Sequence, residues 1–414
     1  MTRLVHVTTV PISLRFITGQ AQFMAQRGLK VAAVSSPEPG LVRFGEQEGV
    51  DVHGIGMARE ISPLRDAVAL ARMVRLFRRL RPTIVHGHTP KGGLLSMCAA
   101  WLTRTPVRVY HLHGLRYVTA TGYQRELLRW TERLSCRLAH RVLCVSPSVR
   151  QVAMNDRICK PEKIAVPLGG TINGIDARGR FNPERFGAKE RLAVRQRYAI
   201  PPDALVVGFV GRIARDKGIT ELLAAKRTLS EEFSNLHWLI VGTFDDTDPI
   251  KPEERDEILG DSRIHLTGWI EDIVELYAAM DVLVLPTYRE GFPTAPIEAA
   301  AMEVPVVATR IPGCVDAVQD GVTGTLVPPR DPESLAAAIR AYLKAPELRR
   351  RHGQAGRERV LREFRQEAIW EALFQEYVRL LQEKGLPPPK PDQIVEFESV
   401  GAHEPATAGV AGSN

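Results

Sequence analysis

Two glutamates flank a short turn, and their position beside a predicted helix start suits them to chemistry. The segment Glu290-Gly-Phe-Pro-Thr-Ala-Pro-Ile-Glu298 follows an apolar run at 282–286 and leads into a helical pattern at 298–302. Free N–H groups at the start of a helix can hold a phosphate, and ionised carboxylates accept hydrogen bonds from sugar hydroxyls. The turn therefore predicts a nucleotide-sugar site. The alternative is a polar loop followed by a glutamate that only complements the helix dipole.

A second loop in the same half of the chain carries two cations. Arg212 and Lys217 follow a predicted strand that ends at Gly211, and a helical pattern begins after Gly218. Ligands of open α/β sheets bind beyond the carboxyl ends of the strands. Both cations are thus placed to neutralise a diphosphate, Arg with a planar fork and Lys as a point charge. The alternative is a pair of solvated loop cations.

Several histidines cluster at predicted strand ends in the first half. His111 and His113 share one side of a strand because side chains alternate, and His86 and His88 end the preceding strand, shortly before Lys91. A histidine at such an edge can act as an acid or base, or orient a sugar hydroxyl. We expect these groups to face one crevice. The alternative is a set of hydrogen-bonded core histidines.

Two further patterns carry weaker signals. The loop after the first strand, residues 8–20, is expected to close over phosphates or an acceptor, although it offers only Gly19 and no doubled glycine. Asp246 and Asp248 match the D-x-D pattern of metal-dependent sugar transferases of another fold, but they lie in an acidic stretch typical of a solvated loop. The five cysteines form no C-x-x-C pair, which argues against zinc and fits free thiols in a reducing cytoplasm.

These residues need a scaffold, and the alternation of strand and helix patterns predicts one. A chain of 414 residues suits two domains, here two doubly wound, Rossmann-like α/β domains. Strands are expected at 4–8, 30–35, 83–86, 107–112, 141–145, 205–211, 237–242, 264–267, 282–286, 306–309 and 324–327. Helices are expected at 19–26, 64–80, 93–102, 124–139, 219–233, 273–280, 297–302 and 332–343.

The predicted domains are residues 1–187 and 188–362. A long amphipathic segment at 357–384 follows the second domain. The tail, residues 385–414, lacks the apolar content to pack and is predicted to be disordered.

Charge is distributed unevenly between the halves. Residues 1–187 hold 28 Lys and Arg against 12 Asp and Glu, whereas the remainder holds 27 against 36. Basic amphipathic helices predicted at 64–81 and 123–141 favour a membrane contact, although each alone would pass for an ordinary surface helix. The N-terminus reads as a strand and not as a signal peptide, and no run is long enough to span a membrane. We therefore expect a cytoplasmic protein, peripheral at the inner face of the membrane, with no nucleic-acid partner.

Taken together, the motifs resemble those of retaining glycosyltransferases of family 4, which have the GT-B fold. The resemblance covers residues 1–384, and the N-terminal half is similar to bacterial capsule and exopolysaccharide transferases. The residues that carry it are Val7-Thr-Thr-Val-Pro, His86-Gly-His-Thr-Pro-Lys-Gly, Asn173-Gly-Ile-Asp176, Gly211-Arg212…Lys217-Gly218, Arg289-Glu290-Gly-Phe-Pro…Glu298-Ala and Gly313…Asp320-Gly…Thr323-Gly324.

The resemblance implies a role for each candidate residue. His113 and Glu290 would be catalytic, and residues 363–384 would form a helix that returns to the first domain. Lys91, His88 and Arg116 would contact the acceptor. The donor would be bound by Arg212 and Lys217 at its diphosphate, by Glu298 at the ribose, by Glu290 at the sugar, by the Thr294 and Ala295 amides at the distal phosphate, and further by Gly19, Ile270, Gly291 and Phe292.

By the same resemblance the donor is a UDP-sugar, the acceptor is a sugar on polyprenyl diphosphate or another glycan, and neither a metal nor a separate cofactor is needed. Attack would come on the face of the leaving group, whose phosphate oxygen takes the acceptor proton. Two other classes stay open. A nucleotide-sugar epimerase of the same fold would need an acid/base pair on the sugar, which we do not identify. A non-catalytic polyanion-binding protein would need no donor site.

Overall fold

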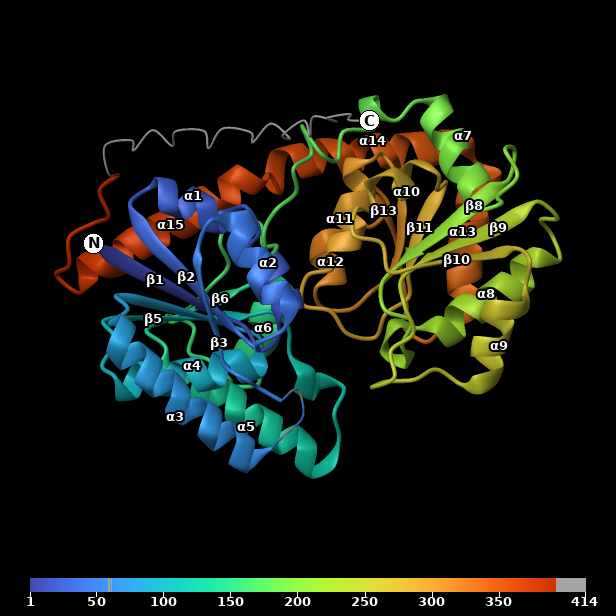
Figure 1. Cartoon of the computed structure of the whole chain (residues 1–414). Helices are drawn as coiled ribbons and strands as arrows, with labels where there is room; N and C mark the ends of the chain where they lie inside the picture. The colour runs from blue at the N-terminus through green and yellow to red at the C-terminus, as the bar shows by residue number, and fades with distance from the viewer. Residues whose placement is uncertain (59, 61, 392–414) are drawn as a thin grey trace, which may run out of the picture.

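The computed structural model describes residues 1–58, 60 and 62–391, and in them the chain forms two domains. Each is built on one parallel sheet covered by helices on both faces (Figure 1). This confirms the predicted pair of doubly wound, Rossmann-like domains. Of the tail predicted to be disordered, residues 392–414 lie outside the described part, and residues 385–391 contain no helix or strand.

The first sheet has seven strands, two more than predicted. The additional strands sit at its edges, where an exposed four-residue strand and a two-residue strand give no apolar run for sequence analysis to detect. In spatial order the strands are β3 (Asp51–Gly54), β2 (Leu29–Ser35), β1 (Thr2–Val7), β4 (Ile84–His88), β5 (Val107–Leu112), β6 (Arg141–Cys144) and β7 (Ile164–Ala165).

The second sheet has six strands, all of which were predicted. Most are apolar on both faces, as expected for strands covered by helices on each side. In spatial order they are β10 (Ile264–Gly268), β9 (Leu236–Val241), β8 (Leu205–Val210), β11 (Val282–Leu285), β12 (Val306–Thr309) and β13 (Gly324–Val327).

Helices cover both sheets. Those of the first domain are η1 (Pro11–Ile17), α1 (Gln20–Gln26), α2 (Pro39–Glu48), α3 (Pro63–Leu80), α4 (Pro90–Leu102), η2 (Arg116–Val118), α5 (Gly122–Leu138) and α6 (Pro147–Asn155). The chain continues with η3 (Pro183–Arg185), α7 (Ala188–Arg197), η4 (Arg215–Lys217), α8 (Ile219–Ser230), α9 (Pro252–Gly260), α10 (Val274–Ala278), α11 (Thr294–Ala301), α12 (Cys314–Ala317), α13 (Pro332–Lys344) and α14 (Pro346–Glu363).

Of the α-helices longer than one turn, five were not predicted in full: α2, α6, α7, α9 and α14, of which only the last two turns of α14 lie in the predicted segment 357–384. A proline in the first turn starts four of them, all except α7. Proline suits that position because its fixed φ matches the helix and its missing N–H would have no partner there. Among the described residues no helix is both long and apolar enough to cross a membrane.

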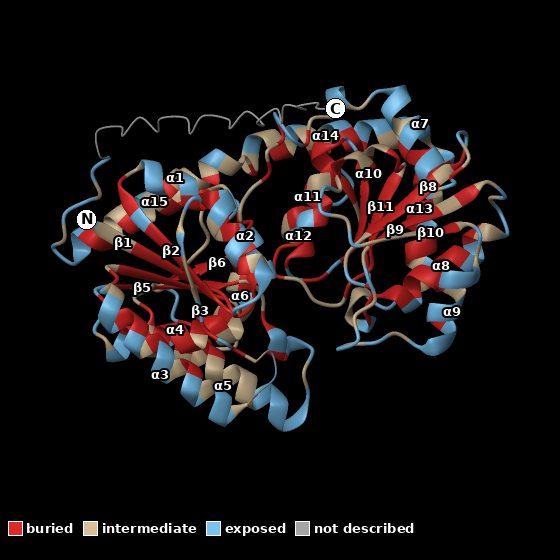
Figure 2. Cartoon of the chain, viewed as in Figure 1, coloured by how far each residue is buried: buried red, intermediate tan, exposed pale blue. Residues whose placement is uncertain are grey.

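Most residues of both sheets are buried (Figure 2). In the first domain, Val5, Val85 and Tyr110 pack with the helices of one face, whereas Leu4 and Val109 pack with α1 on the other. Successive residues of a strand therefore pack in two separate cores, because side chains alternate between the two faces of a sheet.

The last helix, α15 (Gln366–Glu383), crosses from the second domain to the first (Figure 1). Its residues Leu373, Tyr377 and Leu381 complete the core beneath α1. This confirms the predicted crossover. The prediction of one helical segment over 357–384 is wrong, because α14 ends at Glu363 and Arg365 is extended before α15 begins.

The break between the two helices has a packing cause. Phe364 is buried in the core of the second domain, whereas α15 must lie on the first. The chain also enters the second domain earlier than predicted. Ile172, Ile175 and Phe181 precede the predicted domain boundary at residue 187, but they pack in the core of the second domain.

Candidate active site

The predicted site residues lie on loops at the carboxyl ends of the two sheets. In the second domain, β8 and β11 are hydrogen-bonded neighbours, so the loop that carries Arg212 and the loop that carries Glu290 leave the sheet side by side. In the first domain, β5 ends at Leu112 and is followed directly by His113 and Gly114. Fold topology thus brings motifs far apart in sequence to one place, as open α/β sheets do.

Lys217 and Glu290 are in direct contact. Lys217 Nζ lies 2.5 Å from Glu290 Oε1, and each side chain is only 15% exposed. The φ of +70° at Gly218 and the close approach of its Cα to the Pro286 carbonyl allow the two loops to meet here. The predicted phosphate-binding lysine and the predicted sugar-binding glutamate therefore form one ion pair.

Arg212 is held by carboxylates that sequence analysis did not assign to the site. Its guanidinium pairs with Asp245 and lies 3.6 Å from Asp216, which also pairs with Arg289 at 3.0 Å. Asp245 belongs to the acidic stretch interpreted as a solvated loop. That interpretation is wrong for Asp245, and the charge complementarity between this stretch and the Arg212 loop was the available signal.

Asp248, the second aspartate of the D-x-D pattern, is likewise structural. Its carboxylate accepts the Asp216 N–H at 2.8 Å and pairs with Arg215 at 3.0 Å, whereas Asp246 is exposed. The acidic stretch therefore shapes the cation loop through hydrogen bonds.

The start of α11 offers free main-chain donors. Its N-cap is Pro293, and no side chain caps the helix. Thr294 is exposed and Ala295 is buried, so the first turn presents N–H groups beside the Lys217–Glu290 pair, where the helix dipole favours an anion. Phe292 differs from the prediction, because its side chain is buried against Phe364 and can offer a ligand only main-chain atoms.

Glu298 is oriented by a buried tyrosine. Tyr277 Oη donates a hydrogen bond of 2.6 Å to Glu298 Oε2. Burial raises the pKa of Glu298, which the hydrogen bond from Tyr277 partly offsets. Sequence analysis missed Tyr277, which sits in α10 and has no local signal. Ile270 is half-buried beside Trp269, over whose ring the Arg15 guanidinium of the first domain lies at 5.2 Å.

The two domains touch at the site through main-chain atoms. A Cβ built on Gly291 would lie 1.9 Å from the His113 carbonyl oxygen, so only glycine permits this approach. Ser146 donates to the Gly291 carbonyl at 2.9 Å, and Ser148 accepts from the Gly313 N–H at 2.7 Å. His113 and the Glu290–Gly291 turn thus face each other across the domain boundary.

The predicted strand-end histidines do gather, but they do not line an open crevice. His86, His88 and His111 are buried, and only His113 is half-exposed. His88 Nδ1 lies 3.0 Å from His113 Nε2, so His88 cannot contact an acceptor directly as predicted. Ring nitrogens of His88, His111 and His113 lie within 4.8 Å of one another, as do those of His6, His86 and His88. The expectation that no metal is needed stays a prediction.

Three other candidates lie apart from this constellation or beside it. Gly19 N–H donates to Glu48 Oε1 at 2.7 Å and its Cα packs against Trp370, which removes its predicted role in phosphate binding. Lys91 is paired with Asp66 at 2.8 Å, so its ammonium is already neutralised within the first domain. Arg116 is exposed, and among the described residues it has no hydrogen bond or ion pair.

Arg116 nevertheless lies close to two cations of the second domain. Desolvation lowers its pKa, and the guanidinium groups of Arg289 and Arg212 lower it further, which puts all three cations near one another. An arginine of the first domain therefore comes near two arginines of the second, whose charges Asp245 and Asp216 balance in part.

Known proteins resemble this chain in sequence and in fold. The family model for glycosyl transferases group 1 matches residues 190–359, and the model for the glycosyl transferase 4-like domain matches residues 15–169. The chain is 31% identical to the capsular polysaccharide biosynthesis glycosyltransferase CapM of Staphylococcus aureus over 381 residues, covering 92% of this chain and 98% of that protein.

Two further matches are more distant. An Escherichia coli UDP-Gal:alpha-D-GlcNAc-diphosphoundecaprenol alpha-1,3-galactosyltransferase is 26% identical over 288 residues, 68% of this chain and 72% of that protein. The crystal structure of Anabaena HepE in complex with UDP-glucose superposes with a TM-score of 0.75 at 19% identity, over 91% of this chain and 99% of that one, and shows the same fold. The chain therefore belongs to the family 4 glycosyltransferases of the GT-B fold and is related to the capsular enzyme CapM.

Proposed function

We propose that this glycosyltransferase moves a hexosyl or N-acetylhexosaminyl group from a UDP-sugar to a lipid-linked sugar or another glycan. The acceptor carrier is a polyprenyl diphosphate, and the product is a bacterial surface polysaccharide such as a capsule or lipopolysaccharide. The reaction retains the anomeric configuration and uses no metal ion. Support comes from the similarity to CapM and to the Escherichia coli galactosyltransferase, whose own acceptor is a diphosphoundecaprenol-linked sugar.

The contact between Lys217 and Glu290 carries the proposal. It places an ammonium for a phosphate beside a carboxylate for sugar hydroxyls, next to the uncapped start of α11. A UDP-sugar presents both of these groups in the same order, with the ribose beyond the diphosphate. Glu298 then accepts from the ribose hydroxyls, and Ile270 packs near the base.

The chemistry follows from this placement. The bond between the anomeric carbon and the diphosphate oxygen breaks, and charge develops on the leaving UDP. Lys217, Arg212 and the α11 amides stabilise that charge where a metal would otherwise be used. The acceptor oxygen attacks the same face through an oxocarbenium-like transition state, and its proton passes to the departing phosphate oxygen. Closure of the domains over the donor excludes water and limits hydrolysis.

Arg116 is proposed to meet the acceptor. It is exposed, lies near Arg212 and Arg289, and comes from the domain that faces the donor site. A diphosphate on the acceptor would complement these cations. Lys91 and His88 are not retained as acceptor ligands, because both are engaged within the first domain.

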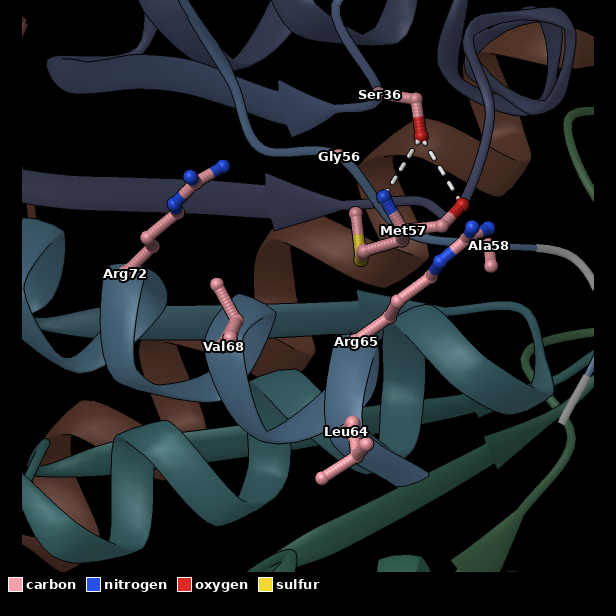
Figure 3. A pocket seen from close by; sticks show the side chains of 8 residues that line it. All are labelled: Ser36, Gly56, Met57, Ala58, Leu64, Arg65, Val68 and Arg72. Atoms are coloured by element: carbon pink, nitrogen blue, oxygen red, sulfur yellow. Dashed lines mark hydrogen bonds between the residues drawn. The ribbon is translucent and has the colours of Figure 1, made fainter. Parts of the chain in front are cut away.

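A groove on the first domain is proposed to lie against the membrane. It has a volume of about 520 Å³ and runs between the segment after β3 and the first turns of α3 (Figure 3). Leu64 and Val68 are exposed there beside the cationic Arg65 and Arg72. Apolar groups flanked by arginines suit the interface of an anionic bilayer, at the cytoplasmic face where UDP-sugars are available.

Vesicle flotation tests the membrane contact. Arg65→Glu/Arg72→Glu is expected to reduce binding to vesicles containing anionic lipid by about tenfold or more, since each basic residue contributes about 1 kcal/mol near such a surface. The matched control is Arg350→Glu/Arg351→Glu, two exposed arginines of α14. An equal loss of vesicle binding in both variants would mean that only the net charge of the protein matters. That result would contradict the proposal that this groove contacts the membrane.

Transfer itself is tested with labelled UDP-sugars and a polyprenyl-diphosphate-linked acceptor. We expect a product whose anomeric configuration, measured by NMR, equals that of the donor, and a rate that survives EDTA. Interconversion of the free UDP-sugar without transfer would establish the epimerase instead. Tight binding of polyanions with no turnover of any donor would establish the non-catalytic alternative.

A further inference from the structure

Behind His113 lies a buried row of five imidazoles: His6, His86, His88, His111 and His113. All but His113 are less than a tenth exposed, and His6 and His86 are fully enclosed. Burial lowers the pKa of every member far enough to keep each ring neutral at physiological pH. Neutral rings have one N–H and one lone pair each, so their tautomers must be compatible with one another.

Strand register creates this row. His6 of β1 pairs with His86 of β4, and His88 of β4 pairs with His111 of β5. Residues two apart on a strand share a face, which adds His113 to the same side. The helix on that face, α15, contributes Tyr377, whose Oη is 2.5 Å from His86 Nδ1.

Three of the rings form a hydrogen-bonded chain that ends at the site. His6 Nδ1 lies 2.9 Å from His88 Nε2, and His88 Nδ1 lies 3.0 Å from His113 Nε2. His88 therefore uses both of its nitrogens, one as donor and one as acceptor. The chain has only two proton arrangements, and they differ in which end carries the outermost N–H.

The two ends are not equivalent. Among the described residues neither His6 Nε2 nor His113 Nδ1 has a hydrogen-bond partner. Both atoms are enclosed, but the His6 residue has no exposed surface at all, so an N–H at its Nε2 would be left unpaired, which is costly. The His113 residue is partly exposed and lies at the domain boundary, so a small movement of the surrounding loops on substrate binding would bring a partner to its Nδ1.

We propose that His88 and His6 are positioning residues, which fix His113 as the Nδ1–H tautomer and so present an N–H donor to a hydroxyl of the donor sugar. His6 donates to His88, His88 donates to His113 Nε2, and Phe16, stacked on the His113 ring at 4.8 Å, holds the ring plane. The assignment of the sugar as the partner rests on the proposed function. The tautomer itself follows from the chain and can be measured without any turnover.

Nitrogen-15 NMR of the full chain with labelled histidine tests the tautomer, because protonated and bare ring nitrogens resonate in separate regions. Signals are assigned by their loss in His113→Asn. We expect the proton of His113 on Nδ1 in the wild type. In His88→Leu, which offers no donor, His113 should lose this preference. His88→Gln keeps one donor and one acceptor and should largely restore it.

The same variants give a kinetic readout. A donor aligned for the transition state affects kcat more than KM, so His88→Leu is expected to lower kcat by about tenfold with little change in KM for the UDP-sugar. His88→Gln should recover most of that loss. The matched control is His265→Leu, because His265 and His237 form a similar 2.9 Å imidazole pair in the second sheet, on strands β9 and β10. It should leave kcat and the His113 spectrum unchanged.

Three results would overturn the inference: a proton on Nε2 of His113 in the wild type, a His113 spectrum unaffected by His88→Leu, or stoichiometric zinc in the purified protein. Zinc would mean that the ring nitrogens, several of which lie within 4.8 Å of one another, act as ligands. If His113 has its proton on Nδ1 but the protein transfers no sugar, the proposed function is wrong and the inference about the histidine chain is retained.

Discussion

Lys217 Nζ lies 2.5 Å from Glu290 Oε1, in an ion pair that joins the loop after β8 to the turn after β11. Each residue neutralises the charge of the other. A bound UDP-sugar would offer each a different partner, phosphate for the lysine and hydroxyl for the glutamate. In the proposed function, donor binding therefore separates the two residues.

The first prediction separates the role of this ion pair in stability from its role in donor binding. Lys217→Ala and Glu290→Ala should each lower kcat/KM by about a hundredfold or more, as the loss of one group that stabilises the transition state commonly does. The exchanged variant Lys217→Glu/Glu290→Lys restores the ion pair but inverts the charges that the donor meets. We expect its melting temperature near that of wild type and its activity as low as that of the single variants. Recovery of activity would show that the pair serves only stability.

A second prediction concerns Glu298 and Tyr277. Glu298→Gln should weaken UDP binding in calorimetry by about tenfold, because a charged acceptor of the ribose hydroxyls is replaced by a neutral amide. The matched ligand is 2′-deoxy-UDP, for which the same substitution should matter less. Tyr277→Phe should have a smaller effect in the same direction, since the carboxylate remains but loses the hydrogen bond that orients it. Equal losses for both ligands would place Glu298 away from the ribose.

Gly291 gives a third prediction. Gly291→Ala puts a methyl group 1.9 Å from the His113 carbonyl and should hold the domains apart. We expect an increased radius of gyration in X-ray scattering and a loss of kcat of about tenfold or more, since misplacement by about an ångström is that costly. Gly260→Ala, at the end of α9 with open space around it, is the control. An unchanged scattering profile together with wild-type activity would contradict the contact.

The fourth prediction concerns pH and stability. Burial raises the pKa of Glu132 from an ordinary 4.5 to about 7, although Tyr110 Oη donates to the carboxylate at 2.7 Å. As pH rises, the carboxyl group loses its proton in the unfolded chain before it does so in the folded protein. The free energy of unfolding is therefore highest below about pH 4.5 and falls by about 3 kcal/mol as pH rises to about 7.

Glu132→Gln removes this dependence. As pH rises from about 4.5 to about 7, the wild type should lose thermal stability relative to the variant. The comparison isolates Glu132 because the other titrating groups are common to both proteins. A constant difference in melting temperature across this range would mean that Glu132 is ionised in the folded state throughout.

Much of the fold could be predicted from the sequence because the strongest sequence signals are local. Apolar runs such as 282–285 and 306–309 mark buried parallel strands, and all six strands of the second sheet were predicted. β3 and β7 were missed because edge strands can be short and half-exposed. The break at Phe364 was missed because amphipathic periodicity continues through it, and only the packing of two different cores requires it.

The site was predictable to the extent that its residues follow strands. Lys217 and Glu290 were assigned from strand ends and do meet. Asp245 and Tyr277 were missed because their roles depend on contacts across loops and helices, which no local pattern encodes. Lys91 and Gly19 were assigned as ligands from their place in motifs, whereas Asp66 and Glu48 engage them within the fold.

The crossing of α15 has a consequence for how the protein is made. Leu373, Tyr377 and Leu381 cover one face of a sheet whose own strands were synthesised first. During translation α15 cannot cover that face, which includes the enclosed His86, until the second domain and α15 itself have left the ribosome. The first domain is therefore the last to be completed, and a nascent chain that stops before Gln366 would present an apolar sheet surface to chaperones.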